Sequence, residues 1–498
     1  MEQEKRSSGI LLPVFSLPSR YGIGCFSAEA YSWIDILNRA GQRYWQLLPM
    51  GPADETGSPY LPLSSFAGNP FFIDLSRLVA EGRLKEDDVD RVATAKEQNI
   101  VDYPHLAQYR WRLLRQAFSC IKTDRWMEQF QEENRYWLED YALFMALKHH
   151  FGESLSWNCW ELALRDREPE TMEEYKEKLS EEVSFHKWTQ YEFFREWEGI
   201  HGYAKEKNIS VIGDMPMYVS YESADCWAHS RLFQLDTRKQ PRRIAGVPPD
   251  GFSATGQIWG NPVYRWEANE EEQYQWWVQR VKRNFALYDV LRLDHFRGFD
   301  AFYSLDGDAV DGKDGQWNPG PGSRLFSVLQ KEIPKASFIA ENLGFLTDSV
   351  ETLRQHLAIP GTKVLQFAFD GDSGNEYLPH NYSKDMVAYT GTHDNDTLKG
   401  WYTSLSWEQR QYICRYLGLE TEEASVDRVV DCLIAIVQSS VAGLVIIPAQ
   451  DFLHLGSRAR CNTPGTVGNN WSWRMSPRQF TSELADSIKE RCRIYGRC

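Results

Sequence analysis

The chain has 498 residues, a net charge of −15 and a pI of about 5.3. It lacks the excess of Lys and Arg that nucleic acids and anionic membranes attract, so neither is an expected partner. Its nine cysteines are scattered and contain no CxxC pair. This pattern is neither a disulfide framework nor a zinc site, and it favours the reducing cytoplasm.

Eight short apolar or β-branched runs, each ending in polar, Gly or Pro residues, are predicted to be strands. In chain order they are residues 9–15, 44–50, 211–219, 290–296, 337–343, 363–369, 386–392 and 443–449. Amphipathic helical patterns, such as 26–41 and 426–440, lie between most of them. Buried strands that alternate with helices predict a parallel sheet, and eight of them predict an α/β fold of the (β/α)8 TIM-barrel type over residues 1–498.

Two apolar stretches are tested as targeting or membrane segments. The run 9–15 is too short for a signal peptide and has no cleavage site of small residues. The stretch 432–450 is interrupted by Gln438, Ser439, Ser440 and Pro448. It predicts a buried helix end followed by a buried strand, and no membrane span is expected.

The spacing of the predicted strands is uneven, which indicates insertions. We expect a mostly helical insertion at 60–200 after strand 2, a second at 220–285 after strand 3 that includes an active-site loop at 246–256, and a short one at 300–335 after strand 4. Gly and Pro in the segment 244–262 predict a shaped loop without regular structure. The first two insertions leave from the carboxyl ends of strands, where barrel enzymes build their sites.

Three acidic residues, Asp294, Glu341 and Asp394, follow predicted strands 4, 5 and 7. Neighbouring strands lie about 4.8 Å apart, so the carboxyl groups of Asp294 and Glu341 can approach the roughly 5–5.5 Å separation of a retaining glycosidase. A single Asp at a strand end is more often a helix cap. Three of them, each after a barrel strand, favour chemistry at a glycosidic bond.

The residue types divide the work between these carboxylates. The shorter Asp294 suits a nucleophile, and the longer Glu341 suits a general acid and base. Arg292 lies two residues before Asp294, on the same face of the strand, where its charge would keep Asp294 ionised. Glu341 needs a less polar pocket that retains its proton. His393 and Asp394 could hold sugar hydroxyl groups.

Several longer motifs carry a resemblance to a known family. They are SGILLPVFSLPSRYGIG (8–24), GSPYLPLSSFAGNP (57–70), GDMPMYV (213–219), ADCWAHSRLFQLD (224–236), GVPPDGFSATGQIWGNPVY (246–264), LRLDHFRGF (291–299), IAENLG (339–344), GTHDNDT (391–397) and QDFLHLGSRARCNTPGTVGNNWSWR (450–474). In order and spacing they resemble the 4-α-glucanotransferases, also called amylomaltases or disproportionating enzymes, of the α-amylase clan. The matches run from residue 8 to residue 474.

This resemblance implies a barrel without a separate C-terminal β domain. It implies Asp294 as nucleophile, Glu341 as acid/base and Asp394 as stabiliser of the transition state. The substrate-binding residues that it implies are Tyr60, Asp214, Asp250, Trp259, Arg292, His393 and Asn395. The family would transfer α-1,4-glucan segments, through a covalent intermediate on Asp294, to the 4-OH of a glucose or glucan.

The implied partners are α-1,4-glucans and maltooligosaccharides, with glucose as acceptor or product. No cofactor and no metal are expected, and the chain would be a monomer or a homodimer. The sequence departs from the family at Gly251, where Tyr is usual, so the residues around it bear on the choice of acceptor.

Other functions remain open at this stage. An α-1,4-glucan hydrolase of the same clan would carry the same three carboxylates, because only the attacking group differs. A non-catalytic glycan-binding protein would be expected to lack at least one of them. A metal-dependent barrel hydrolase needs clustered His ligands that no strand end presents, and phosphate would be repelled by the acidic ends of strands 7 and 8.

Overall fold

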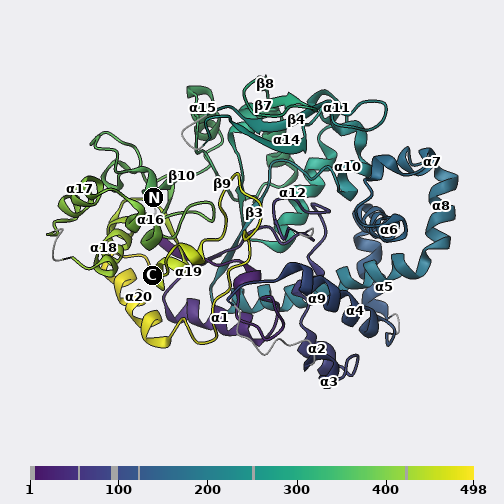
Figure 1. Cartoon of the computed structure of the whole chain (residues 1–498), viewed down its shortest axis with the longest axis horizontal. Helices are drawn as coiled ribbons and strands as arrows, with labels where there is room; N and C mark the ends of the chain where they lie inside the picture. Colours follow the sequence, from purple (N-terminus) through teal and green to yellow (C-terminus); the bar gives the residue numbers. More distant parts are fainter. Residues whose placement is uncertain (1–5, 54–55, 91–98, 122–123, 250–252, 421–423) are drawn as a thin grey trace.

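The computed structural model describes residues 6–53, 56–90, 99–121, 124–249, 253–420 and 424–498 (Figure 1). Its centre is a sheet of eight parallel strands, in the order β10-β11-β12-β1-β2-β3-β6-β9. They are β1 (Ser7–Leu11), β2 (Tyr44–Gln46), β3 (Ser210–Met215), β6 (Val290–Leu293), β9 (Phe338–Ala340), β10 (Gly361–Val364), β11 (Met386–Tyr389) and β12 (Leu444–Pro448). Each overlaps one of the eight predicted runs, and the predicted barrel is confirmed.

The sheet closes between its two end strands, β9 and β10. The N–H of Ala340 donates to the carbonyl of Pro360 at 2.8 Å, and the hydroxyl of Thr362 donates to the carbonyl of Ala340 at 2.9 Å. The strands are shorter than predicted. For example, β1 ends before Pro13, which has no N–H to donate, and Val14–Ser16 form a 3₁₀ turn.

Alternation along the strands divides the apolar core into two parts. Odd and even positions of a strand point to opposite faces of the sheet. One set fills the inside of the barrel and the other packs under the surrounding helices. The inner cluster consists of Leu11, Ile212, Ile339, Val364, Val387, Tyr389 and Ile446. A polar contact also crosses the barrel, where the hydroxyl of Tyr389 donates to the side-chain carbonyl of Gln46 at 2.8 Å.

Helices cover the outside of the barrel between most consecutive strands. They are α1 (Ala28–Arg39), α9 (Ser180–Glu206), α12 (Gln275–Leu287), α14 (Ser323–Glu332), α15 (Asp348–His356), α16 (Leu398–Ser404), α17 (Trp407–Leu417), α18 (Val426–Ser439) and α20 (Ser482–Ile494). Helix α18 and strand β12 account for the apolar stretch 432–450, as predicted. No helix in the described part of the chain is both long and apolar enough to cross a membrane.

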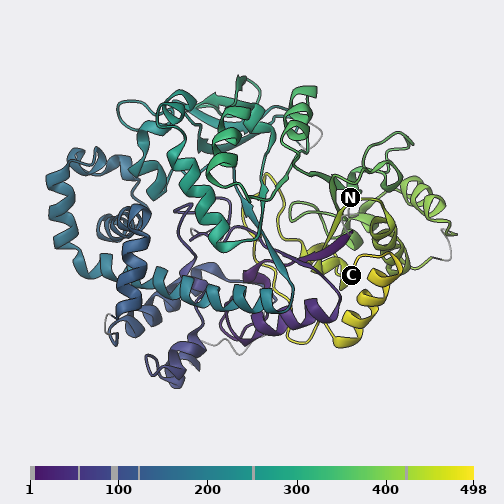
Figure 2. The ribbon, with the colours of Figure 1, turned by 180° about the vertical axis from the view of Figure 1, so that it is seen from behind.

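The segment between β2 and α9 is mainly helical. It contains α2 (Leu75–Ala80), α3 (Glu86–Asp90), α4 (Tyr103–Phe118), α5 (Arg125–Glu133), α6 (Arg135–Phe151), α7 (Leu162–Arg165) and α8 (Pro169–Lys178). Both views place α5–α8 at one side of the barrel and α16–α18 at the opposite side (Figures 1 and 2). The segments after β3, β6 and β12 add α10 (Ala224–Ala228), α11 (Trp266–Glu271), α13 (Arg297–Asp300) and α19 (Ala449–Phe452).

A second, antiparallel sheet lies outside the barrel and was not predicted. Its strands, in the order β5-β4-β7-β8, are β4 (Arg243–Val247), β5 (Gln257–Pro262), β7 (Ala301–Asp306) and β8 (Gln316–Pro319). The prediction that 244–262 has no regular structure is therefore wrong. Gly246 favours the pairing of β4 with β5, because a Cβ at this position would lie 2.4 Å from the carbonyl oxygen of Gln257. Pro262 is compatible with β5 because it occupies the last position of that strand.

Trp197 on α9 packs this helix against its neighbours outside the barrel. Its indole is 2% exposed, contacts Phe26 with ring centroids 5.4 Å apart, and donates its N–H to the carbonyl of Leu287 at 3.0 Å. Trp197→Ala should lower the free energy of unfolding by about 3–5 kcal/mol, measured by urea denaturation. The control Trp197→Phe keeps a ring and should cost only about 1–2 kcal/mol. Equal losses in the two variants would show that ring packing is not what holds α9.

Candidate active site

The period of two along the strands brings the predicted polar residues to the inside of the barrel at one end. Ile212 of β3 and Ile339 of β9 belong to the inner cluster, so Asp214 and Glu341, two residues further on, point the same way. Asp214 and Arg292 are direct partners in the register of β3 and β6. Asp294 follows Arg292 by two residues. Four residues from three adjacent strands thus meet at the carboxyl ends of the strands.

Arg292 is the centre of this group. Its Nη1 lies 2.8 and 2.6 Å from the two carboxylate oxygens of Asp214 and 3.0 Å from Oδ1 of Asp294. The side chain of Arg292 is 4% exposed and that of Asp214 is fully buried, whereas 27% of the Asp294 side chain is exposed. Burial alone would lower the pKa of Arg292, but the charges of Asp214 and Asp294 outweigh it and hold that pKa well above its usual value. Arg292 lies against Asp294, as predicted.

Glu341 has a different environment from Asp294. Its Oε2 accepts a hydrogen bond from the backbone N–H of His295 at 2.8 Å. Burial is the main influence on this carboxyl group. Burial and the negative charge of Asp294 together raise its pKa to about 8, although Arg292 opposes the shift. Glu341 therefore retains its proton at neutral pH, which is the property expected of a general acid.

Asp394 is held as an ionised carboxylate. Its Oδ2 lies 3.3 Å from Nε2 of His393, and its Oδ1 accepts a hydrogen bond from the side-chain amide of Asn462 at 2.7 Å. Burial would raise the pKa of Asp394, but the neighbouring His393 outweighs it and keeps that pKa well below its usual range. In turn, Asp394 raises the pKa of His393, although the burial of the ring opposes this shift. Nδ1 of His393 is buried and has no partner among the described residues.

Two residues that support Asp394 were missed at the sequence level. Besides the bond from Asn462, Nη2 of Arg460 donates to the backbone carbonyl of Asp394 at 2.6 Å. Both residues lie in the long motif 450–474 after β12, and no local pattern in the sequence pairs them with Asp394.

The aromatic residues lie at the rim of the same group. The hydroxyl of Tyr60 donates to Oδ2 of Asp214 at 2.9 Å, and its ring is stacked on His393 with a centroid distance of 5.1 Å. The ring of Trp259 meets His295 edge to face at 4.8 Å. Tyr60 is thus tied to the carboxylate group, and Trp259 lies beside the residue that follows Asp294.

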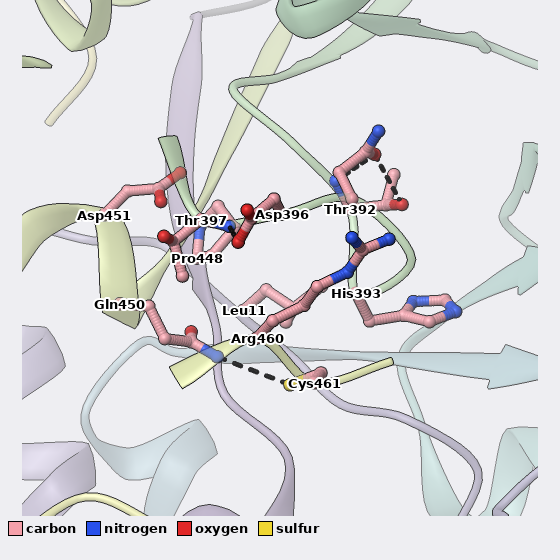
Figure 3. Close-up of a pocket in the computed structure, with 11 residues that line it drawn as sticks. Leu11, Thr392, His393, Asp396, Thr397, Pro448, Gln450, Asp451, Arg460 and Cys461 are labelled. Carbon is pink, nitrogen blue, oxygen red and sulfur yellow. Dashed lines mark hydrogen bonds between the residues drawn. The ribbon is translucent and has the colours of Figure 1, made fainter. Parts of the chain in front are cut away.

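Of the other predicted binding residues, Asn395 closes a turn. Its Oδ1 accepts hydrogen bonds from the backbone N–H and the hydroxyl of Thr392, at 2.9 and 3.0 Å. The segments after β11 and β12 enclose a pocket beside this turn (Figure 3), where Gln450 donates to the thiol of Cys461 at 3.3 Å. The pocket is lined by Leu11, Thr392, His393, Asn395, Asp396, Thr397, Pro448, Gln450, Asp451, Arg460 and Cys461. Asp250 and Gly251 lie outside the described residues.

A parallel barrel with two carboxyl groups on neighbouring strand ends, one of which retains its proton, is the arrangement expected of an enzyme that acts on glycosidic bonds. A family model described as 4-alpha-glucanotransferase matches residues 12–481. The 4-alpha-glucanotransferase of Clostridium butyricum is 44% identical over 489 residues, which is 97% of this chain and 99% of that protein. The 4-alpha-glucanotransferase of Thermus thermophilus is 43% identical over 489 residues, 96% of each chain.

Solved structures agree with these relatives. The structure of amylomaltase from Streptococcus agalactiae in complex with acarbose matches with a TM-score of 0.94 and 38% identity, over 99% of this chain and 100% of that chain. The amylomaltase of Corynebacterium glutamicum has the same fold, with a TM-score of 0.80 at 19% identity, over 99% of this chain and 75% of that chain. The chain therefore belongs to the 4-alpha-glucanotransferase family and is a glucan-transferring enzyme.

The proton of Glu341 has a measurable effect on stability. Its pKa is raised from 4.5 to about 8 in the folded chain, so the stabilisation that it provides is complete below about pH 4.5 and is lost as the pH rises through about 8. Glu341→Gln removes this titration. At pH 8 the variant should be more stable than the wild type by up to about 4 kcal/mol, a difference that should shrink toward pH 5. Urea unfolding across this range measures it, and parallel pH profiles would contradict the raised pKa.

Proposed function

We propose that the enzyme transfers α-1,4-glucan segments by a retaining double displacement, with Asp294 as nucleophile, Glu341 as acid/base and Asp394 as stabiliser of the transition state. The observation that carries this assignment is the contrast between two carboxyl groups on adjacent strands. Asp294 is in contact with the Arg292 guanidinium, whereas the pKa of Glu341 is raised to about 8. A retaining mechanism requires one carboxylate that attacks the sugar and one carboxyl group that donates a proton.

In the first step, Oδ of Asp294 attacks the anomeric carbon of a bound glucan. Glu341 gives its proton to the departing glycosidic oxygen, and the covalent glucosyl intermediate on Asp294 forms as the free end of the donor leaves. In the second step the ionised Glu341 accepts a proton from the 4-OH of the acceptor. That oxygen attacks the anomeric carbon and releases Asp294, so two inversions preserve the α configuration.

The remaining side chains would stabilise the sugar during these steps. Asp394 is ionised beside His393, and its charge would stabilise the positive charge that develops on the sugar ring. The buried Nδ1 of His393 has no partner among the described residues. Tyr60 and Trp259 would offer aromatic faces to glucose units on either side of the cleaved bond.

The proposed partners follow from this reaction. Donors would be maltooligosaccharides or longer α-1,4-glucans, and glucose would serve as acceptor or leave as product. Asp250 and Asn395 remain proposed contacts of the substrate. We also propose a cytoplasmic location, because none of the nine cysteines, all of which the structure describes, is joined in a disulfide. A monomer or a homodimer would fit the same reaction.

Product analysis distinguishes transfer from hydrolysis. With maltotriose as the only substrate, we expect a ladder of longer maltooligosaccharides together with glucose. Anion-exchange chromatography of the products measures this outcome. Glucose and shorter chains alone would identify a hydrolase, because water would then be the only acceptor. For the carboxylate variant described next, Asp348→Asn is a control, because Asp348 is exposed at the start of helix α15 and this substitution should leave the ladder unchanged.

The covalent intermediate should be trapped in Glu341→Gln with α-maltosyl fluoride. Fluoride leaves without a general acid, so Asp294 should still be glycosylated, whereas the missing base slows the second step. Mass spectrometry of peptides should place the adduct on Asp294, and the turnover of maltotriose should fall at least about 10³-fold. An adduct on another residue, or an adduct that persists in Glu341→Gln combined with Asp294→Asn, would overturn the assignment.

A further inference from the structure

The residue that follows Asp294 has an unusual backbone conformation. His295 adopts φ +49°, in the left-handed region that residues other than Gly seldom occupy. On either side of it the chain still pairs with its neighbours: the N–H of Asp294 donates to Met215 at 3.1 Å, and that of Phe296 donates to the backbone carbonyl of Glu341 at 3.0 Å. The N–H of His295 instead donates to Oε2 of Glu341.

The ring of His295 lies among aromatic side chains. Its centroid lies 4.8 Å from that of Trp259, edge to face, and 6.4 Å from that of Tyr218. Gly298 leaves the room that the ring needs, because a Cβ there would lie 3.0 Å from Cδ2 of His295 and 2.1 Å from Sδ of Met217. The N–H of Gly298 donates to the carbonyl of His295 at 2.9 Å.

The ring itself carries no charge at neutral pH. Burial lowers the pKa of His295 to about 4, although Asp294 opposes the shift. Its Nε2 is buried without a partner among the described residues. The imidazole therefore offers Glu341 no positive charge, and the contact between the two residues is the backbone hydrogen bond.

We propose that His295 is a positioning residue for Glu341, because its left-handed backbone directs its N–H at the carboxyl group. This inference rests on the proposed role of Glu341 as acid/base. The hydrogen bond stabilises the ionised form and orients the carboxyl group, so it limits how far burial raises the proton affinity. The other ionisable groups whose charges act on Glu341 or respond to it are Arg292, Asp294, Asp394, Tyr377 and Tyr389.

Variants that differ in their tolerance of positive φ test this proposal. His295→Gly and His295→Asn accept the left-handed conformation without the ring, whereas His295→Ala and His295→Val resist it increasingly. In His295→Val, and more weakly in His295→Ala, the alkaline limb of the pH profile of kcat should move to higher pH, by about one unit for His295→Val. In His295→Val, kcat near neutral pH should fall about tenfold with little change in KM for maltotriose. His295→Gly and His295→Asn should keep the alkaline limb of the wild type.

Asn208→Val is the matched control. Asn208 has φ +58° and lies between α9 and β3, at the opposite end of the barrel from the carboxylates. We expect both Asn208→Val and His295→Val to lower the melting temperature. Only His295→Val should move the alkaline limb of the kcat profile. The proposal fails if all four His295 variants share the same alkaline limb of the kcat profile, or if His295→Ala and His295→Val keep the limb of the wild type. Failure of the proposed function would differ, because the wild type would then form no ladder from maltotriose.

Discussion

The buried guanidinium of Arg292 is the constraint on which the arrangement of the site depends. A charge of this kind inside the barrel costs several kcal/mol unless oppositely charged partners compensate for it. Asp214 on the adjacent strand and Asp294 at the end of the same strand supply that compensation. Because the strands are held in register by backbone hydrogen bonds, the three side chains cannot rearrange independently. Asp294 is thereby held with one oxygen on Arg292 at the mouth of the barrel.

Around this fixed charge, nearby carboxyl groups have opposite proton affinities. Glu341 retains its proton because burial and the charge of Asp294 outweigh Arg292. Asp394 loses its proton because His393 and Asn462 stabilise the anion. This difference in proton affinity between Glu341 and Asp394 comes from the strands that the two residues follow. Glu341 follows β9, next to the Asp294 strand, whereas Asp394 follows β11 and meets the polar segment after β12. Separate elements thus allow groups of the same chemistry to have different roles.

The segments outside the barrel complete the site at its rim. The antiparallel sheet of β4, β5, β7 and β8 joins the chain after β3 to the chain after β6, and Trp259 of β5 reaches the ring of His295. On another side, Tyr60 from the segment after β2 is stacked on His393. Residues far apart in the chain are therefore coupled to the carboxylates through aromatic contacts, and these same rings are the proposed surfaces for sugar units.

The sequence by itself determined the barrel, because eight buried strands alternating with helices form a local pattern that has few other solutions. It also placed Arg292 and Asp294 on one face of a strand, since a strand has a period of two, and it placed Glu341 at the end of the next strand along the chain. The pairing of β4 and β5 was not predictable, because strand pairing depends on partners far along the chain and Gly-rich segments favour turns when taken alone. Only the tertiary structure decided which oxygen of Asp394 meets Asn462, and that His295 turns its N–H toward Glu341. Both contacts join segments whose separation in space no local pattern encodes.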